Sequence, residues 1–290
     1  MHGWVILDKP TGITSAHAVA KVKRLLKPMK IGHAGTLDPL ASGVLPLALG
    51  EATKTMPYVI EHDKKYLFTA TWGQARDTDD MEGQITATSE LRPSREAIEA
   101  LLPHFTGTIL QAPPSYSAIK IDGKRAYDLA RSGQNPEMKP REVTVYKIEI
   151  VDYNQDATVF SCHCGKGTYI RSIARDMGQA LGCFGTISAL RRTQVGKFGL
   201  EHAISLELLA DMVHKSDRCF VQPVEFALDD IPARNIDSDQ ALLLKRGHTI
   251  PLPSTMEEPG AKILARHDGK VVAICEAGPG TMKPVRVFNL

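Results

Sequence analysis

The sequence predicts an α+β fold in two parts. Residues 1–230 are expected to form a mixed, mostly antiparallel central sheet flanked by helices, and residues 231–290 a small β-rich domain. Strand-like alternation of apolar residues, as in Tyr66–Trp72, occurs among segments whose apolar residues repeat with helical spacing. From about Pro232 the pattern changes to short strands and a hairpin turn.

The N-terminal segment is predicted to be a strand followed by a helix. The strand ends near Leu7–Gly12, where proline and glycine indicate a turn. The helix has Thr14 or Ser15 as its N-cap residue and stops before Pro28. Its apolar residues are Val19, Val22, Leu25 and Leu26. Its Lys and Arg side chains are interpreted as solvated charges.

The stretch Gly32–Lys54 organises the chain. Asp38, followed by Pro39, lies among glycines that allow unusual backbone conformations, and the apolar run Val44–Leu49 is expected to fix this turn in a core. Taken alone, Asp38 is most simply a helix N-cap residue with proline at the first helical position. The density of glycine and proline favours another interpretation, a rigidly held catalytic carboxylate.

Further strands and helices are predicted in the middle of the chain. They are the strands 66–72, 143–151 and 158–164 and the helix 94–102. The acidic stretch Asp77–Gly83 lacks the spacing of an EF-hand, so a polar turn is favoured over a metal site.

Residues 111–147 are rich in turn-forming, basic and tyrosine residues, and we expect an excursion from the sheet with a short helix near Ala126–Arg131. Basic residues interleaved with tyrosine suit phosphate contact and base stacking. On composition alone, an ordinary charged loop is slightly favoured.

A helix is predicted from about Gly167 to Gly182, the second glycine being its C′ residue. Arg171 then lies in the first turn, where the helix macrodipole disfavours a cation. An anionic partner close to Arg171 would offset this unfavourable interaction. A surface carboxylate, a phosphate and Asp38 are all candidates.

The C-terminal residues are predicted to form a small β-rich module. A short helix at 238–246 and a strand within 247–252 precede two strands joined by the hairpin His267-Asp268-Gly269-Lys270, and Val285–Asn289 is the final strand. The module is too small for a large active site and suits a binding appendage.

The composition argues against a membrane-spanning protein and against a disulfide-bonded one. No stretch approaches the ~18 consecutive apolar residues of a membrane span, and five cysteines without paired spacing indicate a reducing compartment, so we expect a cytoplasmic protein. The net charge is only +2, but Lys and Arg exceed Asp and Glu in residues 1–54, 111–147 and 163–197. These basic segments suggest a polyanion footprint if the fold brings them together. Three unrelated solvated faces are the alternative.

Known catalytic patterns are missing from the sequence. It has no Ser/His/Asp motif, P-loop, Gly-x-Gly-x-x-Gly or metal-ligand pattern. One aspartate without a second acid or metal suits covalent or electrostatic catalysis by a carboxylate.

Five motif groups follow one another between residue 5 and about residue 200. They are Leu7–Pro10, Gly32–Pro39 with Ala41–Pro46, Pro113-Pro114 with Tyr116–Lys120, Gly167–Arg171 and Leu190–Thr193. Together they resemble the signature of the TruB family of tRNA pseudouridine synthases, in the family's order. The tail, ending Arg286–Asn289, is similar to the family's PUA-like module.

The resemblance implies the pseudouridine synthase fold and isomerisation of uridine 55 in the T loop of tRNA, without cofactor or metal. The expected partner is the T stem-loop, and we expect a monomer. Because the base must be detached, rotated and rejoined through carbon, the nucleotide has to leave the stack, and the pocket has to exclude water.

The resemblance also assigns residues. Asp38 matches the catalytic aspartate, Arg171 its arginine partner and Tyr66 the tyrosine that stacks on the target base. His33 matches a residue that takes part in base flipping. Further RNA-contacting positions are Lys9 beside the site, Tyr169 and Leu190 around the base, and Lys120 and Arg125 in the loop 111–147 that closes on the RNA.

Three alternatives remain. A guide-RNA-dependent synthase shares the core motifs, although this chain lacks long basic extensions. A tRNA-binding or tRNA-folding chaperone would use Asp38 only as a cap. An RNA-modifying enzyme of another type, such as a methyltransferase, would need a Gly-rich cofactor loop after a strand.

Overall fold

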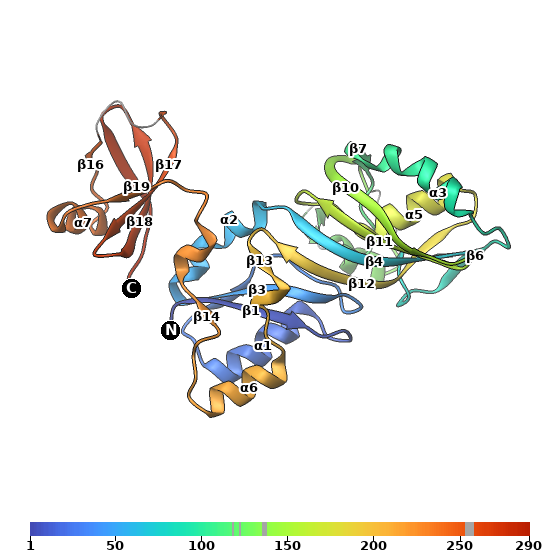
Figure 1. Ribbon diagram of the computed structural model, residues 1–290, viewed down its shortest axis with the longest axis horizontal. Coiled ribbons are helices and arrows are strands. Elements are labelled where there is room, and N and C mark those ends of the chain that lie inside the picture. The colour runs from blue at the N-terminus through green and yellow to red at the C-terminus, as the bar shows by residue number, and fades with distance from the viewer. Residues whose placement is uncertain (118, 122, 135–137, 253–257) are drawn as a thin grey trace.

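The computed structural model describes residues 1–117, 119–121, 123–134, 138–252 and 258–290. Figure 1 shows a long central sheet with helices beside it and a separate small sheet near the C-terminus. The predicted α+β class with a C-terminal β-rich domain is confirmed.

The central sheet is mixed and almost entirely antiparallel. Its strands, in their order across the sheet, are β14 (Val221–Gln222), β1 (Gly3–Lys9), β3 (Ser42–Leu49), β12 (Gly185–Val195), β4 (Lys64–Trp72), β11 (Ala157–Cys164), β10 (Arg141–Tyr153) and β7 (Gly107–Gln111), while β2 (Ile31–His33) pairs with β3 and β13 (Phe198–Gly199) with β12. The parallel pair is β3 with β12, which meet at Ser42–Arg191 and Gly43–Arg192. The sheet therefore changes direction beside the Asp38 loop.

Most helices of the described residues begin and end close to the predicted ones, although no helix was predicted at 56–61. The helices are α1 (Ser15–Leu26), α2 (Met56–Glu61), α3 (Arg95–Leu101), α4 (Ala126–Arg131), α5 (Ile170–Ala180), α6 (Leu206–His214) and α7 (Ser238–Lys245), with the 3₁₀ turns η1 (Gly50–Thr55), η2 (Leu102–Phe105), η3 (Leu200–His202) and η4 (Val224–Ala227). Thr14 and Ser94 cap α1 and α3 through side-chain oxygens that accept backbone N–H groups. Leu181 ends α5, and Gly182 follows with φ 70°.

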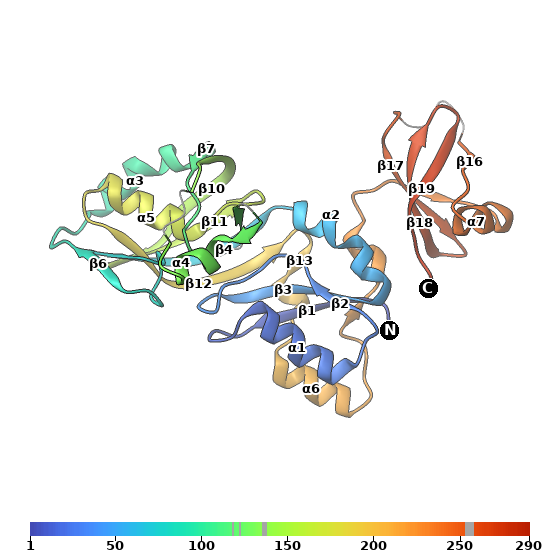
Figure 2. The same cartoon turned by 180° about the vertical axis from the view of Figure 1, so that it is seen from behind.

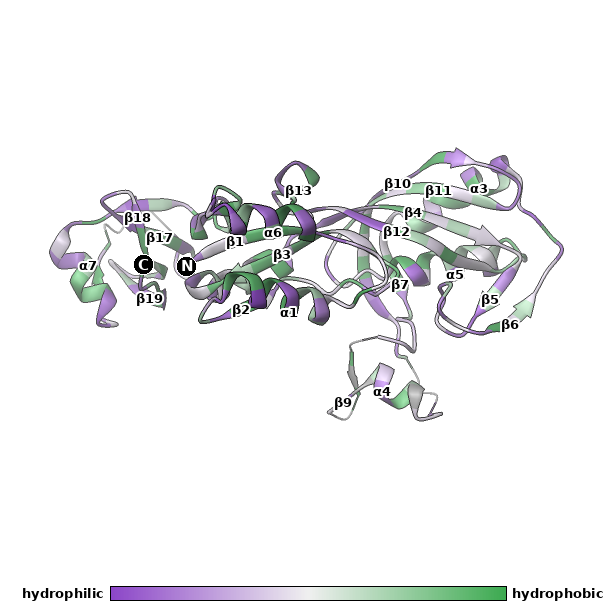
Figure 3. Cartoon of the chain, turned by 90° about the horizontal axis from the view of Figure 1, so that it is seen from below, coloured by the Kyte–Doolittle hydropathy of each residue, from purple (hydrophilic) through white to green (hydrophobic). Residues whose placement is uncertain are grey.

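Two short ribbons complete the larger part of the chain. β5 (Gln74–Arg76) pairs with β6 (Ile85–Thr88), and β8 (Lys120–Ile121) pairs with β9 (Lys124–Arg125). The second ribbon and α4 lie in the predicted excursion between β7 and β10. Figure 3 shows that this excursion extends away from the sheet.

The central strand β12 was not predicted. Its second half, Arg191–Gln194, is polar, so it was interpreted as part of a basic surface. In the structure β12 lies between β3 and β4, and Arg192 is 1% exposed. Tertiary packing determines the conformation of this segment, because the fold supplies the buried Arg192 guanidinium with hydrogen-bond partners from neighbouring loops.

The main core lies between the sheet and its helices. The run Val44–Leu49 is buried and forms most of β3, so the expectation that it fixes the Asp38 turn in a core is confirmed. Phe68, Trp72 and Phe160 pack together on one side of the sheet, as the alternation of Tyr66–Trp72 predicts.

The second sheet has the order β15 (Ala233–Asn235), β17 (Lys262–His267), β18 (Lys270–Gly278), β19 (Thr281–Val287) and β16 (Ile250–Pro251). Asp268 and Gly269 turn between β17 and β18 with positive φ, as the hairpin signal predicts. The final strand starts four residues earlier than expected, because Thr281–Pro284 also pairs with β18. The proposed boundary between residues 230 and 231 falls between η4 and β15.

The C-terminal sheet packs on the larger part of the chain. Phe288 and Ile274 share an apolar cluster with Trp4 and Val59. Near it, Lys54 donates a hydrogen bond to the Val287 carbonyl at 2.7 Å. The segment that directly follows β3 therefore also contacts the C-terminal domain.

Within the described ranges, no helix is both long and apolar enough to cross a membrane. The five cysteines are free thiols.

Gly43 tests the contact between β3 and β12. Its φ is +100°, and a Cβ there would lie 2.1 Å from the Arg192 carbonyl oxygen. Gly12, with φ +79° and nothing within 4 Å, is the matched control. Gly12→Ala should lower the free energy of unfolding by about 1–2 kcal/mol, and Gly43→Ala by about 3–5 kcal/mol because the strands must separate. Urea denaturation measures both, and equal losses would contradict the close approach.

Candidate active site

The loop that carries Asp38 connects β2 to β3 and is held from several sides. Ser15 Oγ donates to the Leu37 carbonyl at 2.9 Å and accepts from the Leu37 N–H at 2.8 Å. Gly12 N–H donates to the Pro39 carbonyl at 2.8 Å. No helix starts at Pro39, so the N-cap alternative for Asp38 is wrong.

Arg192 supports the same loop from inside the protein. Its Nη2 donates to the Gly35 carbonyl at 3.0 Å and its Nε to the Val44 carbonyl at 2.8 Å. These bonds join β12 to both ends of the Asp38 loop. Gly35, with φ +100°, leaves room for the guanidinium, because a Cβ there would lie 3.2 Å from Arg192 Nη1.

Lys9 is buried beside the loop. Its Nζ donates to the carbonyls of Pro10 and Ile13 at 2.8 and 2.7 Å. Burial lowers the pKa of Lys9 to about 8, although the nearby carboxylates of Asp38 and Glu82 oppose the shift. Lys9 therefore fixes the turn at the end of β1.

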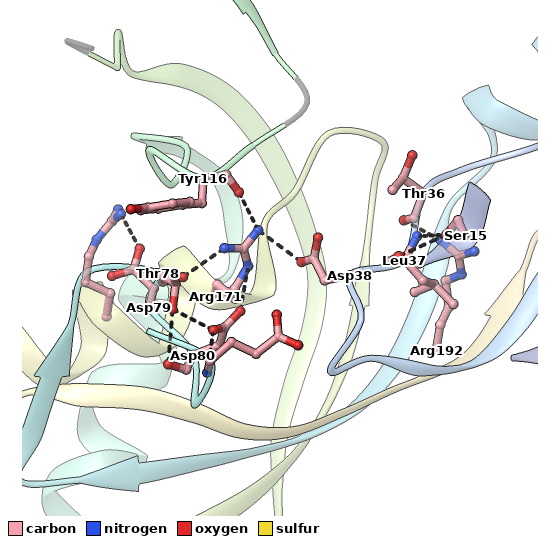
Figure 4. A network of polar contacts seen from close by, with 12 residues as sticks. Ser15, Thr36, Leu37, Asp38, Thr78, Asp79, Asp80, Tyr116, Arg171 and Arg192 are labelled. Carbon is pink, nitrogen blue, oxygen red and sulfur yellow. Dashed lines mark hydrogen bonds and ion pairs between the residues drawn. The ribbon is translucent and has the colours of Figure 1, made fainter. Parts of the chain in front are cut away.

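Asp38 forms an ion pair with Arg171, as Figure 4 shows. Arg171 Nη2 lies 3.0 Å from Asp38 Oδ2, and the Asp38 side chain is 37% exposed whereas that of Arg171 is 5% exposed. The carboxylate thus reaches solvent while its partner is fixed within the protein. The negative charge of Asp38 compensates for the unfavourable position of the Arg171 cation in the first turn of α5.

Arg171 also contacts two other segments. It donates to the carbonyls of Thr78 at 2.8 Å and Tyr116 at 2.9 Å, and its Nε lies 3.7 Å from Asp80 Oδ2. Asp80 in turn accepts from Thr78 Oγ1 and from the Glu82 N–H. The guanidinium is therefore held in one orientation by four groups.

The acidic stretch 77–83 is a turn, but it is more than the polar turn predicted. Asp79 and Asp80 are buried and face Arg175 and Arg171 respectively. Burial raises the pKa of Asp79 to about 6, and Arg175, whose Nη1 lies 2.9 Å from it, opposes the shift. The turn joins the start of α5 to the sheet through ion pairs.

A cavity of about 290 Å³ opens beside Asp38. Its lining includes Asp38, Tyr66, Tyr169, Arg171 and Leu190. Five of the nine predicted site residues therefore share one cavity. Its walls combine a carboxylate, two aromatic rings and an apolar side chain, which suits a planar polar ligand.

The walls of this cavity are rigidly supported. Burial raises the pKa of Tyr66 to about 12, so its phenol stays protonated. Tyr169 starts α5, where its backbone N–H and carbonyl pair with the Gln111 side chain at 2.8 and 3.0 Å. Arg141 lies over the Tyr169 ring at 5.4 Å from its centroid.

Lys9 and His33 do not line the cavity. Lys9 supports the turn, and His33 is half-buried in β2. Lys120 and Arg125 lie in the paired strands β8 and β9, but their side chains are outside the described part of the structure. No role of these four residues is tested, so each stays a prediction.

Three residues around the site escaped the sequence analysis. Asp80 was hidden in the acidic turn and Arg192 in a basic segment, and only the fold separates a buried ion from a solvated one. Lys64 lines the cavity, and its Nζ donates to the Ile60 and His62 carbonyls at the end of α2. Burial lowers the pKa of Lys64 to about 8.

Among the described residues, no three His, Cys, Asp or Glu side chains are grouped as metal ligands would be. Asp79 and Asp80 are occupied by arginines.

Comparison with known proteins defines the class. A family model described as TruB family pseudouridylate synthase (N terminal domain) matches residues 23–170. A second, described as tRNA pseudouridylate synthase B C-terminal domain, matches residues 171–229. The chain belongs to the TruB family of pseudouridine synthases.

Curated relatives agree with this assignment. The chain is 53% identical to the tRNA pseudouridine synthase B of Bradyrhizobium diazoefficiens, over 100% of this chain and 86% of the relative. It is 48% identical to the protein of the same name from Agrobacterium fabrum, over 99% of this chain and 94% of the relative. The predicted family and enzyme class are confirmed.

Solved structures show the same fold. The chain superimposes with a TM-score of 0.77 and 25% identity on a chain of an H/ACA RNP bound to a substrate RNA containing 2′-deoxyuridine, covering 99% of this chain and 85% of that one. A chain of the archaeal box H/ACA sRNP Nop10–Cbf5 complex gives a TM-score of 0.75 at 26% identity, with 99% and 86% covered.

The buried Lys9 predicts a pH dependence of stability. Between pH 8 and about 10.4, the usual lysine pKa, unfolded Lys9 holds a proton that the folded residue releases. The free energy of unfolding therefore rises with pH, by up to about 1.4 kcal/mol per unit for each such lysine, and Lys64 adds to this rise.

Lys9→Met should reduce this rise between pH 8 and 10, and Lys147→Met, at an exposed lysine, should not. Denaturant unfolding at the two pH values measures the slope. An unchanged slope in Lys9→Met would contradict a lowered pKa.

Proposed function

We propose that this chain isomerises uridine 55 in the T loop of tRNA to pseudouridine, with Asp38 as the essential catalytic carboxylate. One observation carries the proposal: Asp38 is 37% exposed at a cavity of about 290 Å³, which has room for a nucleobase, and it is held by a loop anchored at Ser15, Gly12 and Arg192. The names of the curated relatives, tRNA pseudouridine synthase B, support the substrate.

The reaction moves one glycosidic bond. The bond from ribose C1′ to N1 of uracil breaks, the base rotates, and C1′ bonds to C5. The proton on C5 leaves, and N1 gains one, so the change is an isomerisation. A uridine in a folded RNA loop must first leave its stack, which costs a few kcal/mol.

The cavity residues have distinct tasks in this proposal. The Tyr66 ring stacks on the flipped base, and Tyr169 and Leu190 bound the space in which the base turns. Asp38 acts on the nucleotide, and Arg171 fixes the orientation of its carboxylate. Closure of the loop 111–147, which meets Arg171 through the Tyr116 carbonyl, would keep water from the detached base.

No cofactor, metal or second subunit takes part in the proposed reaction. His33 acts in flipping, while Lys120 and Arg125 contact the RNA from the loop. A guide-RNA-dependent reaction has weaker support, because the chain is 53% identical to a tRNA pseudouridine synthase B and 25% identical to the protein in the H/ACA particle.

The first test is Asp38→Asn, which keeps the size and removes the charge. Pseudouridine formation on a T-arm hairpin should fall by at least about 10⁴-fold, the order found when a single catalytic group is removed. RNA binding and thermal stability should stay near wild type, since among the described residues the Asp38 side chain makes one ion pair, with Arg171, which keeps its other partners. Mass spectrometry of the RNA measures the product. Asp211→Asn, on the surface of α6, is the control. Substantial activity in Asp38→Asn would refute the proposed role.

Arg171→Lys tests the fixed orientation of the carboxylate. The lysine keeps the charge but lacks the planar fork that reaches Asp38, Thr78 and Tyr116 together. Turnover should fall by about 10²–10³-fold, with a much smaller change in the RNA dissociation constant. Single-turnover kinetics and binding titration separate the two. Equal decreases in turnover and binding would instead make Arg171 a phosphate contact.

A further inference from the structure

We propose that the exposed cations at the end of α1 form a binding surface for the phosphate backbone of an RNA stem. The patch, called the α1-end patch here, consists of Lys23, Arg24, Lys27 and Lys30, all exposed. The inference rests on the proposed function, because it assigns the stem of the RNA whose loop enters the cavity. It replaces the interpretation of the α1 cations as plain solvated charges.

The charge of the patch is uncompensated within the described part of the chain. None of its four cations has a carboxylate within ion-pair distance, although exposed lysines elsewhere, such as Lys147 and Lys215, do pair. Residues 21–37 contain no Asp or Glu. Lys21, on the side of α1 that faces α6, differs because Glu207 is near it. The four cations of the α1-end patch, which have no such carboxylate neighbour among the described residues, therefore keep a positive field, which attracts a polyanion.

The position of the patch fits a stem that leaves the cavity. The first turn of α1 contacts the Asp38 loop through Ser15, and the patch cations Lys23 to Lys27 follow about 12–18 Å further along the helix. The chain returns directly through β2 to His33 and Asp38. Figure 2 shows α1 and β2 on the same side of the molecule as α4 and the loop 111–147.

The far end of the patch is close to the C-terminal domain. The Lys30 carbonyl accepts from the Gly50 N–H at 2.9 Å, and η1, which begins at Gly50, contacts that domain through Lys54 and Val287. The patch thus lies between the catalytic loop and the C-terminal domain. The catalytic loop, the patch and the C-terminal domain thus follow one another along the molecule, and an extended polyanion could contact all three.

The backbone of Lys27 allows stability and RNA binding to be separated at one position of the patch. Lys27 ends α1 with φ 46° and ψ 46°, a left-handed conformation in which glycine is favoured and a side chain costs stability. Lys23 and Arg24 would stabilise the helix end through the macrodipole without any ligand. Glycine at position 27 would relieve the left-handed backbone, whereas Lys27 places a further exposed cation in the patch.

Lys27→Gly separates the effect on stability from the effect on RNA binding because the two have opposite signs. The melting temperature should rise, since glycine relieves the left-handed residue, and the affinity for a T-arm hairpin should fall. Retained affinity in Lys27→Gly would overturn a phosphate contact at this position.

The salt dependence of binding tests the patch as a whole. For Arg24→Gln/Lys27→Gln/Lys30→Gln, the slope of log K against log salt should become shallower by about 0.9 for each phosphate that the variant no longer neutralises. The matched control, Lys147→Gln/Lys215→Gln/Arg218→Gln, removes three exposed cations from β10 and from the region after α6. Equal slopes in patch and control variants would overturn the proposal.

Two further measurements locate the contact. The patch variant should have a lower affinity for a hairpin with its full stem and a nearly unchanged affinity for the same loop on a shortened stem, with turnover unchanged at saturating RNA. Equal decreases on both RNAs would place the contact at the loop and overturn the assignment to the stem. Altered sedimentation with unchanged RNA affinity would overturn it too, marking the patch as a contact between copies of the chain. Failure of the proposed function differs from these outcomes, because wild-type protein would then form no pseudouridine.

Discussion

One buried guanidinium joins the parts of this molecule that make the site. Arg171 binds the Asp38 loop, the acidic turn at Thr78 and Asp80, and the loop 111–147 at Tyr116. These segments are distant in sequence, and each offers oxygen atoms to the same planar group. Because a buried charge without partners is costly, the three segments and α5 have to assemble together. The geometry at Asp38 follows from that requirement.

Arginines inside the protein and cations on its surface have different physical tasks. Arg171, Arg175 and Arg192 all come from the basic segment 163–197, yet their guanidinium groups bind carbonyls and carboxylates of the chain itself. They are poor candidates for phosphate contact. The exposed cations of the α1-end patch, in the segment 1–54, have no such carboxylate partners among the described residues. A charge count along the sequence therefore overstates the cations available to a polyanion in the segment 163–197. It also does not show which cations of the segment 1–54 lack a carboxylate partner.

Much of the fold could be predicted because local signals agreed with the final structure. Thr14 and Ser94 cap their helices, Gly182 follows α5, and Asp268-Gly269 turns the last hairpin. The strand β12 and the buried roles of Asp80 and Arg192 could not be predicted in this way. Their neighbours come from remote parts of the chain, so no local pattern marks a polar residue as internal. The roles expected of the five predicted residues that line the cavity came from the resemblance to the TruB family, although Asp38 and Arg171 had also been singled out by their local sequence.

The placement of Asp38 also explains why a single carboxylate suffices in the proposed chemistry. A second acid is unnecessary for a reaction in which one glycosidic bond is exchanged for another within the same nucleotide, provided that the base is retained. The side chains that line the cavity retain the detached base, and no further reactive group is needed for this. Tyr66, Tyr169 and Leu190 supply those side chains from the sheet and from the start of α5. In this proposal the rigid parts carry the chemistry, while the loop 111–147 and the α1-end patch bind the RNA.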